Sequence, residues 1–270
     1  MPRDRPGEPA ELPTSGAGRL LSLDLWHTLV YLDPEAEEAY MREQVDLATR
    51  VLSAAPQSGA ASANDGQLRS TFEAVYAEAV AASQQGRSVP PAAQIVEAGR
   101  RTGRRPDPRT YLEGLQRLVS ETRFREAPGA LQTLDQLRND GWRTAVVSNT
   151  VGEPGASLRP VLERTGFQSR IDAYVFSDEL PWTKPAPEIF REAPGRLGIP
   201  LTSTVHVGDG WVDIEGARRA GLRAGVLFTG LQHYGARYRT LFLPPGWESP
   251  PTDYRVASWS ELPALLAGLG

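Results

Sequence analysis

Short apolar runs alternate with amphipathic segments along most of the second half of this 270-residue chain. RTAVVSN, IDAYVFS, TVHVGD and RAGVLF have the apolar, β-branched character of buried strands. Helix-like segments such as PGALQTLDQLRNDG and DIEGARRAG lie between them. Alternation of this kind predicts a parallel sheet with helices on both faces. LLSLDL, over 20–25, is similar in character and predicts the first strand of that sheet.

The remaining elements of this sheet region are less regular. We predict a helix near 158–164, another over PEIFREAPGRLG although Pro194 interrupts it, and a last helix over SELPALLAGL entered through Ser260. Residues 232–253 carry many Pro, Gly and aromatic residues and predict a loop.

Residues 34–126 follow a different pattern. Ala, Glu, Gln and Arg dominate, and apolar residues recur at helical spacing in EAYMREQVDLATRVL, STFEAVYAEAVAAS, AAQIVEAG and TYLEGLQRLVS. We predict a small bundle of four helices inserted after the first strand. The fold class is therefore α/β: a Rossmann-like, doubly wound parallel sheet over 19–33 and 127–270, with an inserted α-helical domain over 34–126.

Composition narrows the class of protein. A net charge of −4 and a pI near 5.6 argue against a broad basic surface, so we expect no nucleic-acid partner. The absence of cysteine excludes disulfides and thiolate chemistry and fits a reducing compartment. No apolar run approaches the roughly 20 residues that span a bilayer. Residues 1–18 lack the apolar centre of a signal peptide and predict a disordered leader. We expect a cytoplasmic protein, monomeric or homodimeric.

Polar residues collect where the predicted strands end. Asp24 closes the first strand, Ser148 and Asn149 the second, and Asp209 the fourth, while Lys184 lies in the loop after the third. In open parallel sheets, ligands bind outside the carboxyl ends of the strands. We therefore expect these side chains to meet in one small volume.

DLWHTL, VVSN, the Lys184–Pro185 pair before PEIF, and HVGDGWVDIEGARRAG resemble the four ordered motifs of the haloacid dehalogenase superfamily. The resemblance covers nearly all of residues 20–228, and the inserted helices resemble that family's cap domain. It implies a Mg²⁺-dependent hydrolase, most often a phosphatase acting on a small phosphorylated molecule.

The resemblance also implies roles for individual residues. A carboxylate that attacks an anionic phosphate ester needs a cation beside it, and Mg²⁺ prefers oxygen ligands. The implied catalytic residues are Asp24 as nucleophile, Lys184 as neutralising cation and Ser148 as ligand of the phosphoryl oxygens. The implied metal ligands are Asp24, Asp209 and the main-chain carbonyl of Trp26, with Asp213 in support and Asn149 near the substrate.

One position departs from the family's phosphatases. Two residues after the nucleophile they carry a second Asp as general acid and base, and here Trp26 occupies that position. Three interpretations follow. The protein is a phosphatase whose acid comes from elsewhere, with His27 as a candidate, or whose substrate has a good leaving group. It is a dehalogenase, because a halide leaves without a proton, or it is a non-catalytic protein that binds a phosphorylated ligand or partner. The retained metal ligand Asp209 favours the phosphatase. A phosphonatase is disfavoured because residues 33–126 contain no lysine.

Three of the six tryptophans lie in loops that should frame the site: Trp26, Trp182 and Trp211. They either pack loops together or form an aromatic wall for a substrate with a bulky apolar or ring-containing body. His206 is predicted to be a core residue and His233 a loop residue.

Overall fold

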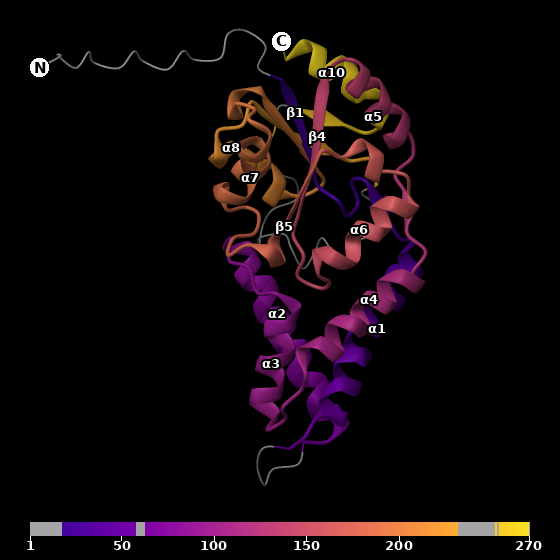
Figure 1. The fold of residues 1–270 in the computed structure, drawn as a ribbon, viewed down its shortest axis with the longest axis vertical. Helices are drawn as coiled ribbons and strands as arrows, with labels where there is room; N and C mark the ends of the chain where they lie inside the picture. Colours follow the sequence, from indigo (N-terminus) through magenta and orange to yellow (C-terminus); the bar gives the residue numbers. More distant parts are fainter. Residues whose placement is uncertain (1–17, 58–62, 232–251, 253, 270) are drawn as a thin grey trace, which may run out of the picture.

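The computed structural model describes residues 18–57, 63–231, 252 and 254–269. Its main sheet has six parallel strands in the order β5-β4-β1-β6-β7-β8. Figure 1 shows three of them, β5, β4 and β1. The strands are β1 (Arg19–Leu23), β4 (Trp142–Ser148), β5 (Ala173–Phe176), β6 (Thr204–Gly208), β7 (Ala224–Phe228) and β8 (Arg255–Val256). The predicted α/β class is confirmed. The first five of these strands are those that the apolar runs predicted.

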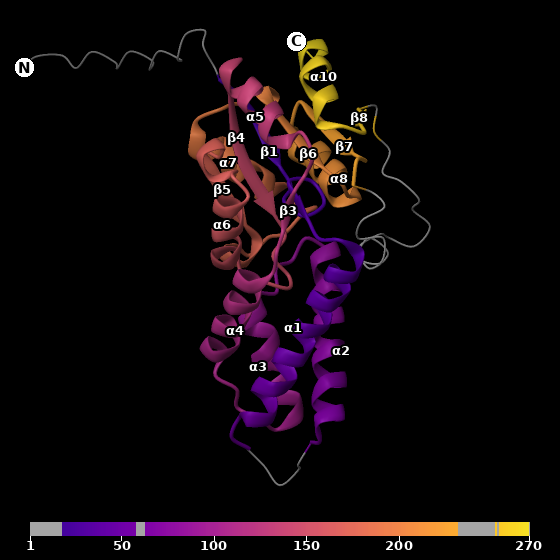
Figure 2. The same cartoon turned by 90° about the vertical axis from the view of Figure 1, so that its right-hand side faces the viewer.

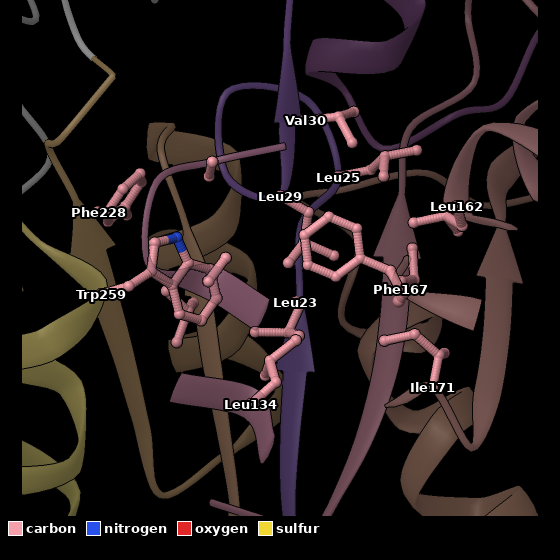
Figure 3. Close-up of a cluster of buried hydrophobic side chains, with 14 of the residues drawn as sticks. Leu23, Leu25, Leu29, Val30, Leu134, Leu162, Phe167, Ile171, Phe228 and Trp259 are labelled. Carbon is pink, nitrogen blue, oxygen red and sulfur yellow. The ribbon is translucent and has the colours of Figure 1, made fainter. Parts of the chain in front are cut away.

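Helices cover both faces of the sheet. The helices are α5 (Ala130–Asn139), α6 (Gly155–Arg164) and α10 (Leu262–Gly268) on one face, and α7 (Pro187–Leu197) and α8 (Trp211–Ala220) on the other. Successive side chains of a strand point to opposite faces. Leu21 and Leu23 of β1 accordingly lie in the apolar core on the side of α5, α6 and α10, and Leu20 lies in the core on the side of α7 and α8. Figure 3 shows Leu23 and Leu134 packed between the sheet and α5.

Two helix boundaries could be defined only from the structure. α7 continues through Pro194 to Leu197 and ends at Gly198 in the left-handed conformation. The last helix is not entered through Ser260: Ser258 accepts the N–H of Ser260 to cap a short 3-10 turn, and α10 begins at Leu262. The four 3-10 turns of the described residues are η1 (Gln168–Arg170), η2 (Ser177–Glu179), η3 (Leu201–Ser203) and η4 (Trp259–Glu261).

The inserted segment forms four helices that extend from one end of the sheet domain (Figure 2). They are α1 (Pro34–Ala54), α2 (Asp65–Gln84), α3 (Pro91–Thr102) and α4 (Pro108–Glu121), packed around their own apolar core. At the two crossings between the domains, β2 (Val30–Tyr31) pairs antiparallel with β3 (Arg125–Glu126). Two-residue strands are too short for a periodic pattern, so the sequence did not predict them.

Other predictions concern residues that are not described. The leader over 1–17 and most of the predicted loop, 232–251 and 253, lie outside the described residues. Within the described residues, none of the helices combines the length and apolar character that a bilayer crossing requires.

The contact between α7 and α8 leaves no room for a side chain at Gly216. A Cβ there would lie 2.1 Å from the ring of Phe190. We expect Gly216→Ala to lower the free energy of unfolding by about 1–3 kcal/mol, because an overpacked core forces side chains from their rotamers. Denaturant unfolding measures this.

Gly195 of α7 is the matched control, since nothing lies within 4 Å of an added Cβ. Gly195→Ala should be neutral or stabilise by up to about 1 kcal/mol. Equal losses in both variants would contradict the packing explanation.

Candidate active site

The chain turns sharply directly after β1. The N–H of Asp24 donates to the carbonyl of Val207 on β6 at 2.9 Å, so the parallel pairing continues for one residue beyond the strand. His27 then adopts the left-handed conformation with φ 54°, and its N–H donates to the carbonyl of Val30 at 2.8 Å. This turn leaves the Asp24 carboxylate at the carboxyl end of the sheet, 6% exposed.

Lys184 lies at the centre of the polar cluster. Its Nζ is 2.5 Å from Oδ1 of Asp24 and 2.7 Å from Oδ1 of Asp213, and the side chain is 2% exposed. Asn149 holds the Lys184 backbone: its Oδ1 accepts the Lys184 N–H at 2.8 Å, and its Nδ2 donates to the Lys184 carbonyl at 3.1 Å. Three predicted residues therefore meet at Lys184.

Three carboxylates surround the same small volume. Asp24, Asp209 and Asp213 each offer an oxygen within 4.8 Å of the other two. Both oxygens of Asp213 already accept hydrogen bonds, Oδ1 from Lys184 and Oδ2 from the N–H of Gly210 at 3.0 Å. One ammonium faces three carboxylates, so the cluster is net negative. A group of hard oxygen donors with excess negative charge fits a divalent cation such as Mg²⁺.

Burial and charge shift the pKa values of this cluster. Burial, with smaller contributions from Asp213 and Asp209, outweighs the opposing effect of Lys184 and raises the pKa of Asp24 to about 7. Burial alone would lower the pKa of Lys184, but Asp213 and Asp24 hold it above its ordinary value. Burial would raise the pKa of Asp213, yet Lys184 and His206 hold it below its ordinary value. Asp213 therefore carries the negative charge that keeps Lys184 protonated.

His206 is a core residue, as predicted, but it also contacts the polar cluster. Its Nε2 lies 3.0 Å from Oδ1 of Asp213, and its Nδ1 lies 2.8 Å from the hydroxyl of Ser22. Burial lowers the pKa of His206, and the neutral tautomer with a proton on Nε2 satisfies both partners. Gly208 leaves the space for this contact, because a Cβ there would lie 2.2 Å from Cγ of Asp213. The sequence signal for this contact is a histidine inside an apolar strand, three residues before Asp209.

Most of the remaining predicted residues lie close in sequence to the members of this cluster, at strand ends, in loops or at a helix start. Ser148 ends β4 and is 1% exposed. Trp211 begins α8 and is 8% exposed, whereas Trp182 is 39% exposed and bridges to Arg87 beside the cap. The ring of His27 is buried and lies 3.2 Å from Glu37 of α1. His233 lies outside the described residues.

Trp26 faces a buried residue that sequence reasoning missed. Its indole N–H donates to Oε1 of Glu153 at 2.8 Å, and its ring packs against Tyr40 and Phe124 at centroid distances of 5.9 and 5.3 Å. Glu153 is 5% exposed. It lies in the loop before α6, and its sequence surroundings, VGEPG, are those of an ordinary exposed turn.

The sequence profile of the haloacid dehalogenase-like hydrolases matches residues 19–221, three quarters of this chain. The chain belongs to this family of hydrolases. The matched segment runs through the strands and turns that carry Asp24, Ser148, Lys184 and Asp209.

Known proteins similar to this hydrolase include phosphatases and dehalogenases. A phosphoglycolate phosphatase of Cereibacter sphaeroides is 37% identical over 106 residues, 39% of this chain and 46% of that enzyme. The (S)-2-haloacid dehalogenase 4A of Burkholderia cepacia is 29% identical over 140 residues, 52% of this chain and 54% of that enzyme. This hydrolase thus spans about half the length of these curated relatives.

The fold extends over nearly the whole chain. The magnesium-bound HAD-hydrolase YfnB of Bacillus subtilis superposes with a TM-score of 0.59 at 16% identity, over 93% of this chain and 100% of that one. The family match identifies a haloacid dehalogenase-like hydrolase, and its curated relatives include phosphatases.

The raised pKa of Asp24 gives the metal-free protein a pH dependence. A carboxyl whose folded pKa lies above its unfolded value makes the fold less stable as pH rises from about 4 to 7. Asp24→Asn cannot ionise, so in EDTA it should raise Tm by several degrees at pH 8 and by clearly less at pH 5. Thermal unfolding at both pH values measures this.

The control is Asp135→Asn on the exposed surface of α5, where the difference from wild type should not vary with pH. A larger gain for Asp24→Asn at pH 5 than at pH 8 would contradict the electrostatic description of the site.

Proposed function

We propose that this hydrolase cleaves a phosphate monoester, with Asp24 as the nucleophile and Mg²⁺ as cofactor. The observation that carries this proposal is the cluster of three carboxylates at the carboxyl end of the sheet, two of which pair with Lys184. Asp24 and Asp209, with the main-chain carbonyl of Trp26, would hold the ion, because both oxygens of Asp213 accept hydrogen bonds of 3.0 Å or less. The bond that Oδ2 of Asp24 accepts from Thr28 is, by contrast, long at 3.5 Å. Bound Mg²⁺ would neutralise the carboxylates and the phosphoryl group.

The chain's own residues would perform the remaining tasks. An Asp24 oxygen attacks phosphorus while the bond to the leaving oxygen breaks, and the leaving oxygen takes a proton from water. Water then releases phosphate from the aspartyl-phosphate and restores Asp24. Lys184, fixed by Asp213 and Asn149, offsets the charge that develops on the phosphoryl group, and Ser148 donates to a phosphoryl oxygen.

The cap supports a substrate with a bulky apolar body. A cavity of about 580 Å³ lies between α1 and α2, within the size range of small-molecule pockets. Its floor includes Gly152, four residues after Ser148, and its walls are largely apolar, with Met41, Val45, Phe72, Tyr76 and Val80 among them. We propose that the organic part of the substrate occupies this cavity, and that Trp182 and Trp211 contact it nearer to Asp24.

A dehalogenase is the second candidate, favoured by the Burkholderia cepacia relative and by Trp26 in place of the second Asp. The carboxylate of Asp209 favours the phosphatase. We further propose a cytoplasmic location, consistent with the lack of cysteine.

The first functional test is metal-dependent turnover of 4-nitrophenyl phosphate. We expect hydrolysis with Mg²⁺ and none in EDTA. Asp24→Asn should lower kcat by about a thousandfold or more because the nucleophile is lost. Asp209→Asn should raise the Mg²⁺ concentration for half-maximal rate by about tenfold or more.

Asp135→Asn controls for a changed carboxylate outside the site and should keep wild-type rates. Halide release from 2-chloropropionate in EDTA, without phosphate release in Mg²⁺, would reverse the choice between the two activities.

The cap cavity can be tested by narrowing it. Ala77 of α2 lines the cavity and is exposed, so Ala77→Phe should fill space without disturbing the helix. We expect KM for a naphthyl phosphate to rise by about tenfold and KM for acetyl phosphate to stay within about twofold, because only the larger body needs the space.

Ala74→Phe is the matched control on the same helix, at an exposed position that does not line the cavity. It should change neither KM. Equal changes for both substrates in Ala77→Phe would show that the cavity does not hold the organic part.

A further inference from the structure

Glu153 is a buried carboxylate whose described partners are all neutral hydrogen-bond donors. Oε1 accepts from the indole of Trp26 at 2.8 Å. Oε2 accepts from Nε2 of Gln44 at 3.0 Å and from the hydroxyl of Tyr40 at 3.4 Å. Burying a charge is costly unless hydrogen bonds compensate it. Three donors that converge on this carboxylate therefore compensate its burial and hold it in a defined orientation.

These donors come from two different parts of the molecule. Trp26 belongs to the turn that follows the nucleophile, whereas Tyr40 and Gln44 lie one helical turn apart on α1 of the cap. Gln44 also donates to the carbonyl of Gly152 at 3.4 Å. Glu153 thus joins the first cap helix to the residue that replaces the general acid.

The space around Glu153 is almost filled. The cavity that Trp26, Tyr40, Gln44, Tyr76 and Glu153 help to enclose measures about 10 Å³. That volume is at the lower limit for one water molecule, so water cannot readily replace a lost partner of the carboxylate. The indole of Trp26 is further held by the rings of Tyr40 and Phe124.

We propose that Glu153 is a positioning residue for the phosphatase proposed above: it fixes the indole of Trp26 beside the nucleophile and couples it to cap helix α1. Trp26 then forms a fixed wall on the side of the active site where the leaving group would lie, at the position where a phosphatase of this family carries its second Asp. The same helix α1 carries Met41 and Gln44, which line the larger cap cavity. Glu153 therefore links one wall of that cavity to the turn that carries Trp26, two residues after Asp24.

This role predicts an effect on substrate binding rather than on chemistry, because Glu153 touches no reacting atom. Glu153→Leu puts an apolar side chain of comparable size in place of the carboxylate and removes both acceptors. KM for naphthyl phosphate in Mg²⁺ should rise by about tenfold, and kcat should fall less than about threefold. Glu153→Gln keeps an acceptor for the indole N–H, and its KM should stay within about twofold of wild type.

A double-mutant cycle tests whether the effect passes through Trp26. In a Trp26→Phe background no N–H is left to hold, so Glu153→Leu should raise KM by less than about threefold. An equal rise in both backgrounds would overturn positioning through Trp26. A residue with only a structural role would lower Tm, or the active fraction and hence kcat, and leave KM unchanged.

A readout without activity separates this inference from the proposed function. Subtracting the fluorescence of each Trp26→Phe counterpart isolates the emission of Trp26. Acrylamide quenching of that emission should increase in Glu153→Leu and stay at the wild-type level in Glu153→Gln. Unchanged quenching in Glu153→Leu would overturn the inference even if wild type is an active phosphatase. Loss of positioning in a protein that turns over no ester would reject the phosphatase proposal alone.

Glu153→Asp serves if Glu153→Leu does not fold. It keeps the carboxylate but withdraws it by one methylene, so it cannot reach Trp26 and Gln44 together. Quenching and KM should both rise, by less than in Glu153→Leu, and wild-type values for both would overturn the proposal.

Discussion

The site depends on the ion pairs that the ammonium of Lys184 forms with two carboxylates. They bring Asp24, at the end of β1, and Asp213, in the first turn of α8, to within 2.5 and 2.7 Å of one nitrogen. Two buried carboxylates could not both stay ionised in this volume without a cation, because each would lose its hydration and repel the other. His206 and Asn149 support the arrangement, one behind Asp213 and the other along the Lys184 backbone. The sheet therefore presents a preformed anionic cluster rather than scattered polar residues.

The cap adds a second layer of constraint. Asn149 donates to the hydroxyl of Ser83 on α2, and Glu153 accepts from Gln44 on α1, so the loop that follows β4 contacts two of the four cap helices through these bonds. Ser148, the proposed phosphoryl ligand, begins this same loop. This loop thus joins, by hydrogen bonds, the residues that would bind phosphate to the cap helices that would bind the organic part of the substrate. The two groups lie in segments far apart in the sequence.

Local patterns predicted the parts of this structure that local physics determines. Apolar runs and helical spacing located five strands of the main sheet and the four cap helices, and the rule for strand ends brought Asp24, Lys184 and Asp209 together. Glu153 escaped notice because its partners on α1 lie 109 and 113 residues away, and no local pattern records such a contact. His206 resembled an ordinary core residue, since its polar partner Asp213 becomes its neighbour only when β6 and α8 pack.

The central claim is that a divalent ion held by Asp24 and Asp209 allows a carboxylate to attack an anionic phosphoryl group. A crystal structure of the protein with Mg²⁺ and beryllium fluoride tests this most directly. We expect a beryllofluoride bonded to the Asp24 carboxylate, with Mg²⁺ coordinated by both aspartates and Lys184 beside the fluorides. A fluoride complex bound away from Asp24, or an ion that leaves Asp209 uncoordinated, would contradict it.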